Sequence, residues 1–197
     1  MSAFSGKYDL VVVGASAGGV DALAQILSAL PRDFGGTILV VQHIAPQTNL
    51  DWMVGSLQDR CLLSIFEAEA NMSIFPPKII FAPPNYHLLV EKSKIVSLDT
   101  GEKRNFSRPS IDMLFESAAD AFTSKLIGVI LTGANDDGAE GLQKIRSLGG
   151  YAVVQDPATA IASEMPEAAI RVAGADDILP LEQIGPKLTM LCGQKWS

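Results

Sequence analysis

The stretch YDLVVVGASAGGVDALAQILSAL, residues 8–30, decides the fold class, because it combines a strand, a glycine-rich turn and a helix. The strand is predicted over 9–13, where β-branched residues dominate, and the helix over 19–30. Pro31 cannot continue a helix and therefore ends it. A strand that leads through glycines directly into a helix favours an α/β protein.

The rest of the chain alternates apolar, β-branched runs with longer amphipathic stretches, which is typical of a parallel sheet flanked by helices. The run 126–133 carries apolar residues on both faces and is predicted to be a central strand. The segments 87–93 and 94–99 flank a turn and predict an antiparallel hairpin. The other predicted strands are 37–42, 63–69, 78–84 and 151–156. The other predicted helices are 48–58, 110–122 with Pro109 in its first turn, 138–148, 165–172 and 180–192.

We therefore expect a three-layer, doubly wound α/β domain whose mostly parallel sheet carries an antiparallel β-hairpin insertion. The 197 residues predict one domain spanning 1–197. Hydrophobic residues make up 48% of the chain and charged residues 19%, a globular balance. The net charge of −7 offers no basic footprint for nucleic acid or an anionic membrane.

Neither a membrane segment nor a metal site is expected from the sequence. No apolar run reaches the roughly 18 residues that span a bilayer, and the N-terminus MSAFSGKYD lacks the features of a signal peptide. Cytoplasmic residence without membrane insertion is the simplest interpretation. Cys61 and Cys192 have neither metal-ligand spacing nor a disulfide framework, so we expect free thiols and no metal.

The glycine turn can be compared with three motifs. A P-loop is excluded because Val20 and Asp21 stand where its lysine and hydroxyl residue belong. A dinucleotide-binding turn is disfavoured because Ser16 replaces the glycine that lets a pyrophosphate approach the backbone. The third motif, G-x-S-x-G, matches residues 14–18 in full and places Ser16 on a tight strand-to-helix turn.

A serine nucleophile needs a base and an orienting acid, and the predicted strand ends supply both. His43 follows the second strand, and Asp136 and Asp137 follow the run 126–133. Because the carboxyl ends of parallel strands meet at one edge, these side chains can converge with Ser16. Either aspartate fits, and Asp156 is a weaker candidate on the same edge.

Each of these residues also has a structural interpretation. Ser16 can be a small turn residue or a helix N-cap, and the aspartates of GANDDG can simply shape a turn. His43 can be a structural histidine that closes its strand, and the same role is favoured for His87 in the hairpin. Arg108 and Arg171 can bind a substrate carboxylate, but solvated or helix-capping roles are commoner.

Six blocks of the sequence follow one another along the chain. They are GASAGGVDAL, VVQHIAP, APPNYHLLVE, RPSIDMLFESAA, LTGANDDGAEGL and VVQDPATAIASEMPEA. In this order they resemble the catalytic domain of the CheB family, the protein-glutamate methylesterases of bacterial chemotaxis. The resemblance covers residues from about 8 to 172. Six ordered blocks are far more specific than G-x-S-x-G alone.

The resemblance implies a Ser-His-Asp triad in which Ser16 is the nucleophile and His43 the base. The acid of the family directly precedes the glycine and alanine of the DGA block, which implies Asp137. We expect the backbone N–H groups of Ala17 and Ala134 to hold the oxyanion. No metal or organic cofactor is needed for this chemistry.

The sequence also departs from the family pattern. Position 17 is alanine where many members have threonine, and residues 134–136 read Ala-Asn-Asp where many read Met-Gly-Asn. The receiver domain that usually precedes the esterase is not expected, because the first strand begins near residue 8.

The resemblance implies hydrolysis of glutamate methyl esters on chemoreceptors to glutamate and methanol. CheB-like enzymes also deamidate receptor glutamines. The alternatives are a non-catalytic signalling module of the same fold, a nucleotide-binding protein and a hydrolase of small esters.

Overall fold

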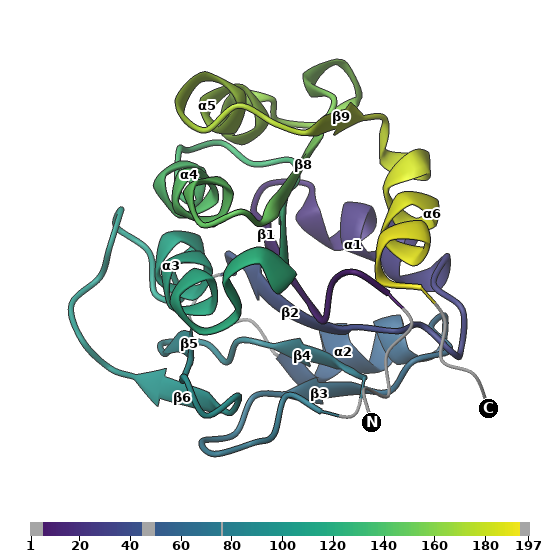
Figure 1. The fold of residues 1–197 in the computed structure, drawn as a ribbon, viewed down its shortest axis with the longest axis vertical. Coiled ribbons are helices and arrows are strands. Elements are labelled where there is room, and N and C mark those ends of the chain that lie inside the picture. The colour runs from purple at the N-terminus through teal and green to yellow at the C-terminus, as the bar shows by residue number, and fades with distance from the viewer. Residues whose placement is uncertain (1–5, 45–49, 76, 194–197) are drawn as a thin grey trace.

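The computed structural model describes residues 6–44, 50–75 and 77–193, and Figure 1 shows a sheet with helices on both faces. Seven strands of the described residues form this sheet in the order β3-β4-β2-β1-β7-β8-β9, and every neighbouring pair is parallel. The strands are β1 (Leu10–Ala15), β2 (Thr37–Gln42), β3 (Ile65–Glu67), β4 (Ile79–Phe81), β7 (Leu126–Ile130), β8 (Tyr151–Gln155) and β9 (Asp177–Leu179). The predicted doubly wound, mostly parallel sheet is confirmed.

Helices cover the sheet in two separate layers (Figure 1). Among the described residues, three helices pack on one face and three on the other, and two short 3-10 turns connect elements. The first face carries α1 (Gly19–Ser28), α2 (Leu50–Gln58) and α6 (Leu181–Cys192). The second carries α3 (Ile111–Phe122), α4 (Ala139–Ser147) and α5 (Glu164–Val172). The 3-10 turns are η1 (Thr123–Lys125) and η2 (Pro157–Thr159).

The two layers exist because successive side chains of a strand point to opposite faces of the sheet. Along β1, Val11 and Val13 belong to the core beneath α1, α2 and α6, whereas Leu10 and Val12 belong to the core beneath α3, α4 and α5. All six residues of β1 are buried. A strand that is apolar on both faces can only be covered on both sides, which fixes the three-layer arrangement.

The predicted hairpin is also confirmed. Strands β5 (His87–Val90) and β6 (Val96–Asp99) pair antiparallel, with His87 opposite Asp99, and form a sheet of their own. Leu88 and Val90 are buried in the core that includes α3, so the hairpin is an outer layer over that helix. Its open end leads into the loop 100–109, which returns the chain to the start of α3.

Three details differ from the sequence predictions. Strand β9 was missed, because three residues, the first of which is an aspartate, show no strand periodicity. Pro109 does not lie in the first turn of α3, since Ser110 is the N-cap and the helix begins at Ile111. Of the predicted helix 48–58, residues 50–58 are helical, and residues 48 and 49 lie outside the described residues.

The chain leaves β1 toward β2 on one side and later returns to β7 on the other side. The strand order therefore reverses at β1, and the crevice at the carboxyl ends of β1, β2 and β7 is where ligands bind in such sheets. The structure thus brings together the segments that follow these three strands. No helix among the described residues combines the length and the apolar character needed to span a bilayer.

Candidate active site

Ser16 occupies the turn between β1 and α1, and hydrogen bonds from both neighbouring strands hold its backbone. Its N–H donates to the Thr132 carbonyl at 2.9 Å, beyond β7, and its carbonyl accepts from the Gln42 Nε2 at 2.9 Å, at the end of β2. The left-handed residue of the turn is Gly18, with φ 77°. A Cβ at Gly19 would lie 2.1 Å from the Gln42 Oε1, so only glycine lets the helix begin there. The turn therefore presents a half-buried Ser16 at a fixed place on the sheet edge.

His43 follows β2 and lies beside this turn. Its N–H donates to the Ala15 carbonyl at 2.9 Å, one residue before Ser16. On the imidazole, Nε2 lies 2.9 Å from the Asp137 Oδ2, and Nδ1 lies 3.4 Å from the Asn135 Nδ2. A carboxylate accepts only, so the Asp137 contact assigns the proton of the neutral ring to Nε2 and leaves Nδ1 as the basic nitrogen.

Asp137 is only 1% exposed, yet its carboxylate is surrounded by donors. The N–H groups of Ile111 and Asp112, the first two residues of α3, donate to it at 2.8 and 3.0 Å. The Ser110 hydroxyl donates at 2.9 Å. The first N–H groups of a helix have no partner within the helix, and its N-terminus attracts negative charge. The Asp137 carboxylate therefore sits where the start of α3 stabilises an anion.

Opposing effects act on the pKa of Asp137. Burial alone would raise it, but the hydrogen bond with His43 and the N–H groups of Ile111 and Asp112 lower it. The hydrogen bonds outweigh the effect of burial, and the pKa of Asp137 falls below its ordinary value. The acid is therefore ionised throughout the neutral range and can stabilise a positive charge on His43.

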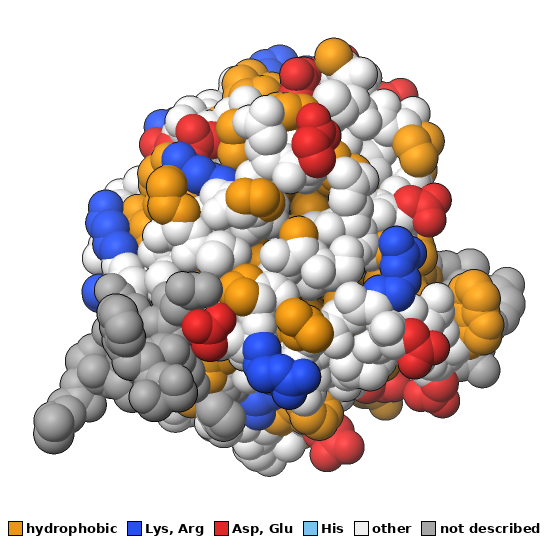
Figure 2. Space-filling view, turned by 90° about the vertical axis from the view of Figure 1, so that its right-hand side faces the viewer, with side chains coloured by type: hydrophobic (Ala, Val, Ile, Leu, Met, Phe, Trp, Pro, Cys, Tyr) orange, Lys and Arg blue, Asp and Glu red, His pale blue; other side chains and the backbone are white. Residues whose placement is uncertain are grey.

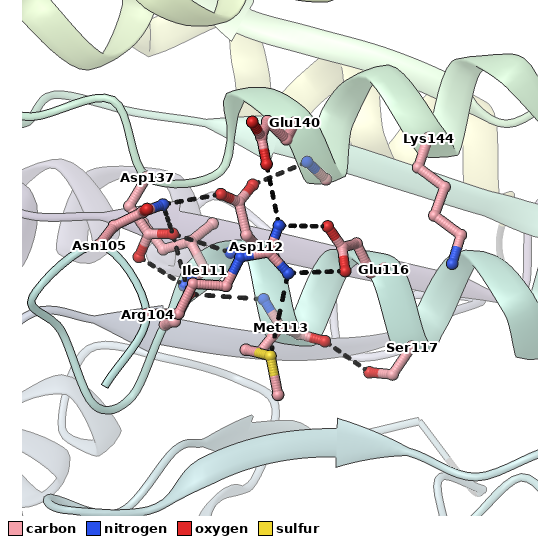
Figure 3. Close-up of polar contacts among 12 residues, drawn as sticks. Arg104, Asn105, Ile111, Asp112, Met113, Glu116, Ser117, Asp137, Glu140 and Lys144 are labelled. Atoms are coloured by element: carbon pink, nitrogen blue, oxygen red, sulfur yellow. Dashed lines mark hydrogen bonds and ion pairs between the residues drawn. The ribbon is translucent and has the colours of Figure 1, made fainter. Parts of the chain in front are cut away.

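A second buried carboxylate, Asp112, lies next to Asp137 (Figure 3). The Asn105 Nδ2 bridges the two, at 2.9 Å from the Asp112 Oδ2 and 3.2 Å from the Asp137 Oδ1. The Gly141 N–H donates to the Asp112 Oδ1 at 2.7 Å. Burial raises the pKa of Asp112 to about 6, and the negative charge of Asp137 adds to this shift. The hydrogen bond from the Gly141 N–H opposes it. The two neighbouring carboxylates therefore differ in the pH at which they ionise.

Arg104 ties this network to the helices α3 and α4 (Figure 3). Its Nη1 and Nη2 donate to the two carboxylate oxygens of Glu116 at 2.8 and 2.6 Å, and Nη2 also donates to Glu140 at 2.9 Å. This fork geometry raises the pKa of the Arg104 guanidinium. Because Arg104 directly precedes Asn105, these ion pairs also anchor the loop that carries Asn105.

The remaining candidates from the sequence are also placed. Ala17 and Ala134 are exposed and lie in the two loops that flank Ser16, since a Cβ at Gly133 would come within 2.9 Å of the Ser16 Cβ. Asp136 is exposed, and the structure brings Asp137 to His43 in its place. Asp156 caps the turn η2 through the Ala158 N–H, so it serves another element.

Three side chains of the site were missed as functional residues. Asn135 was interpreted as part of a turn, Ser110 as part of a helix start, and Asn105 carries no sequence signal because its partners follow 7 and 32 residues later. In the part of the chain that the structure describes, no group of three or more His, Cys, Asp or Glu side chains is arranged to hold a metal ion.

Comparisons with known proteins agree with this fold. The family described as CheB methylesterase matches residues 11–188. A "Putative protein-glutamate methylesterase/protein-glutamine glutaminase" of Leptospira interrogans is 51% identical over 178 residues, which are 90% of this chain and 92% of that protein. The protein-glutamate methylesterase FrzG of Myxococcus xanthus is 39% identical over 92% of this chain and 54% of its own length. The crystal structure of the Thermotoga maritima CheB methylesterase catalytic domain matches with a TM-score of 0.87 at 34% identity, covering 92% of this chain and 97% of that one.

Proposed function

This chain belongs to the CheB methylesterase family, and from that premise we propose that it hydrolyses the methyl esters of glutamate side chains to glutamate and methanol. Deamidation of glutamine side chains to glutamate is the companion reaction, in keeping with the double name of the Leptospira relative. The observation that carries the proposal is the His43–Asp137 pair at 2.9 Å, beside the turn that presents Ser16. The proposed substrate protein is a chemoreceptor that carries methylated glutamates.

The first half of the reaction forms an acyl-enzyme. The Ser16 Oγ attacks the ester carbonyl, and its proton passes to the Nδ1 of His43, because Nε2 already donates to Asp137. The ionised Asp137 stabilises the resulting imidazolium. The backbone N–H groups of Ala17 and Ala134 hold the oxyanion. The tetrahedral intermediate then expels methoxide, which takes the proton from Nδ1 and leaves as methanol.

The second half returns the enzyme to its starting state. A water molecule attacks the acyl carbon while the Nδ1 of His43 removes its proton. Collapse of the second intermediate breaks the ester bond to Ser16, and the proton on His43 returns to the Oγ. The products are a glutamate carboxyl group and free Ser16. With a glutamine substrate, ammonia leaves in place of methanol and all later steps are the same.

Methanol release from methylated receptor membranes is the direct test, comparing the wild type with Ser16→Ala. Removal of a triad nucleophile lowers kcat by about 10⁶-fold in a related mechanism, so we expect loss of detectable release. Ser28→Ala, at the exposed end of α1, is the matched control and keeps the wild-type rate.

Other outcomes separate the remaining alternatives. Release from small esters but not from receptors would keep the triad and discard the receptor substrate. No hydrolysis of any ester would leave a non-catalytic signalling module. The single-domain organisation and the cytoplasmic location stay predictions from the sequence.

A further inference from the structure

A pocket of about 130 Å³ opens directly beside His43. One wall is the loop that joins the hairpin to α3, which contributes Lys103, Phe106, Ser107 and Arg108, and Asn85 faces it. Among the described residues that line this pocket no side chain is a carboxylate, although the whole chain has a net charge of −7. A group that enters the pocket therefore meets two cationic side chains next to the base of the reaction.

The loop is held in place by hydrogen bonds. The Arg108 Nη1 donates to the carbonyls of Thr100 and Gly101 at 2.8 and 2.7 Å. The backbones of Arg104 and Ser107 exchange two hydrogen bonds of 3.2 and 2.9 Å, which close a tight turn. Lys103 precedes that turn and is exposed. The backbone of Lys103 is therefore fixed by the loop, while its flexible four-carbon side chain can bring the ammonium group to a ligand.

Phe106 adds an apolar surface at the rim of the same pocket. Its side chain is 97% exposed, and its backbone is left-handed with φ 61°. A bulky residue in that conformation is unusual, and the turn here holds the ring away from the core. An exposed aromatic ring beside two cations is suited to a peptide, whose side chains offer both apolar stems and charged ends.

The charge of the surface changes sign across the site. A second hollow, which Asn135 lines, is bordered by Asp136, Glu164 and Glu167 together with Arg171. On the face seen in Figure 2, by contrast, basic and acidic side chains are interspersed. The cationic pocket is lined by His43 itself, whereas the acidic hollow is linked to His43 through Asn135, whose Nδ2 lies 3.4 Å from the imidazole Nδ1.

We propose that the pocket formed by Asn85, Lys103, Phe106 and Arg108 binds a carboxylate side chain of the protein substrate, one helical turn away from the ester. This inference rests on the proposed function and names a determinant of substrate choice. A glutamate methyl ester is neutral, so it cannot itself account for two cations beside His43. Side chains four residues apart on a helix have Cβ atoms about 5–6 Å apart, a separation that a lysine stem can span. The carboxylate that the enzyme produces at one site can thus help to bind the segment when a neighbouring ester is hydrolysed.

The test uses synthetic helical peptides that each carry one glutamate methyl ester. The residue four positions before the ester is Glu, Ala or Lys, and a second set varies the residue four positions after it. Methanol release gives kcat/KM for every peptide with the wild type, Lys103→Gln, Lys103→Glu and Lys125→Glu. Lys125 is an exposed lysine before β7, at the opposite edge of the sheet, and serves as the control.

In one of the two sets we expect the wild type to prefer the Glu peptide over the Ala peptide by about 2- to 5-fold, the range of an exposed ion pair. The preference disappears in Lys103→Gln, turns into a preference for the Lys peptide in Lys103→Glu, and is unchanged in Lys125→Glu. It also weakens in 0.5 M salt, because exposed charges are screened.

Equal rates for the three peptides of both sets with the wild type would overturn the proposal and leave the esterase function intact. A preference that survives in Lys103→Glu would overturn the assignment to this pocket. Failure of the wild type to hydrolyse any peptide that carries the ester, with small esters still cleaved, would contradict the proposed function and remove the basis of the inference.

Discussion

The two histidines of this chain, His43 and His87, differ in the kind of partner that each nitrogen meets. His43 is half-buried, and its Nε2 donates to the carboxylate of Asp137. His87 is fully buried, and both of its partners are neutral backbone groups: Nε2 donates to the Glu102 carbonyl and Nδ1 accepts from the Ser110 N–H. The imidazole of His43 thus lies beside a carboxylate that can stabilise a positive charge, whereas the two neutral partners of His87 offer no such charge. Position beside a charge, and not the residue type, decides which histidine can act as a base.

Both histidines are nevertheless joined through two residues, Ser110 and Asp137. Ser110, the N-cap of α3, donates its N–H to the His87 Nδ1 at 3.2 Å and its hydroxyl to the Asp137 Oδ1 at 2.9 Å. His87 thus helps to hold the helix start that in turn holds the acid. The comparison predicts that changes at His43 and Asp137 affect the rate, and that changes at His87 affect mainly the stability.

Among the changes that test this comparison, the largest loss of rate is expected for His43→Gln. Without a base at this position the Ser16 hydroxyl keeps its proton, and kcat should fall by about 10⁶-fold, as for loss of the nucleophile. The melting temperature should stay within a few degrees, since His43 is partly exposed. Methanol release and thermal unfolding measured on the same preparation test both parts, and a surviving rate would assign the base elsewhere.

Asp137→Asn should lower kcat by about 10²- to 10⁴-fold and also destabilise the fold by about 1–3 kcal/mol, because buried donors lose an ionised acceptor. The pKa of Asp137 is lower in the folded chain than its ordinary value of 3.8. Its contribution to stability is therefore present above that pH and is lost as the pH falls through the folded value.

Urea unfolding at several pH values checks this sign. The difference in unfolding free energy between wild type and Asp137→Asn should be largest near pH 7 and shrink below about pH 4. A difference that is the same at every pH would contradict the role of the ionised carboxylate.

His87→Phe should lower the stability of the fold more than it lowers the rate, the reverse of His43→Gln. The ring keeps most of its volume, but the Ser110 N–H and the Glu102 carbonyl lose their partner, which costs about 1–3 kcal/mol of stability. We expect kcat to fall less than about 10-fold under conditions where the variant is folded. A loss as large as that of His43→Gln would break the distinction between the two histidines.

The smallest effect on kcat is expected for Asp112→Asn. The pKa of Asp112 is about 6 in the folded chain, above its ordinary value of 3.8. The contribution of this group to the unfolding free energy is thus complete below pH 4 and is lost as the pH rises through 6, by about 3 kcal/mol at most. The wild type should lose stability over this interval relative to Asp112→Asn, and kcat at pH 8 should change by less than about 3-fold. Unfolding free energies at pH 4 and pH 8 decide the point, and a wild type that gains stability over the interval would contradict it.

Strong periodic signals made most of the fold predictable. Strand 37–42 coincides with β2, because a β-branched run that is apolar on both faces has few alternatives. The end of β1 was placed two residues too early, since Gly14 and Ala15 resemble the turn that follows them. Pairing with the neighbouring strands keeps these residues in the sheet, with Gly14 opposite Ile130 of β7 and Ala15 opposite Gln42 of β2.

The sequence did not predict the direction in which the side chains of a loop point. Strand ends could bring Asp136 and Asp137 to the same edge, but neighbours in a loop point in different directions. Only the start of α3, which lies 26 residues earlier, separates the two by drawing the Asp137 carboxylate inward. Local patterns cannot encode such a contact, and the resemblance to the CheB family alone distinguished the aspartates.

The carboxylate that contacts His43 also caps the N-terminus of α3 from outside the helix, so the two ends of the proposed triad differ in how easily they can be replaced. The hydrogen bonds that hold the Ser16 turn come from its backbone, so another small residue can take its place without disturbing the turn. Asp137 has no such substitute, because the helix start would lose its anion. A related protein that no longer depends on catalysis is therefore expected to lose its serine before its aspartate, because only the aspartate also stabilises the fold.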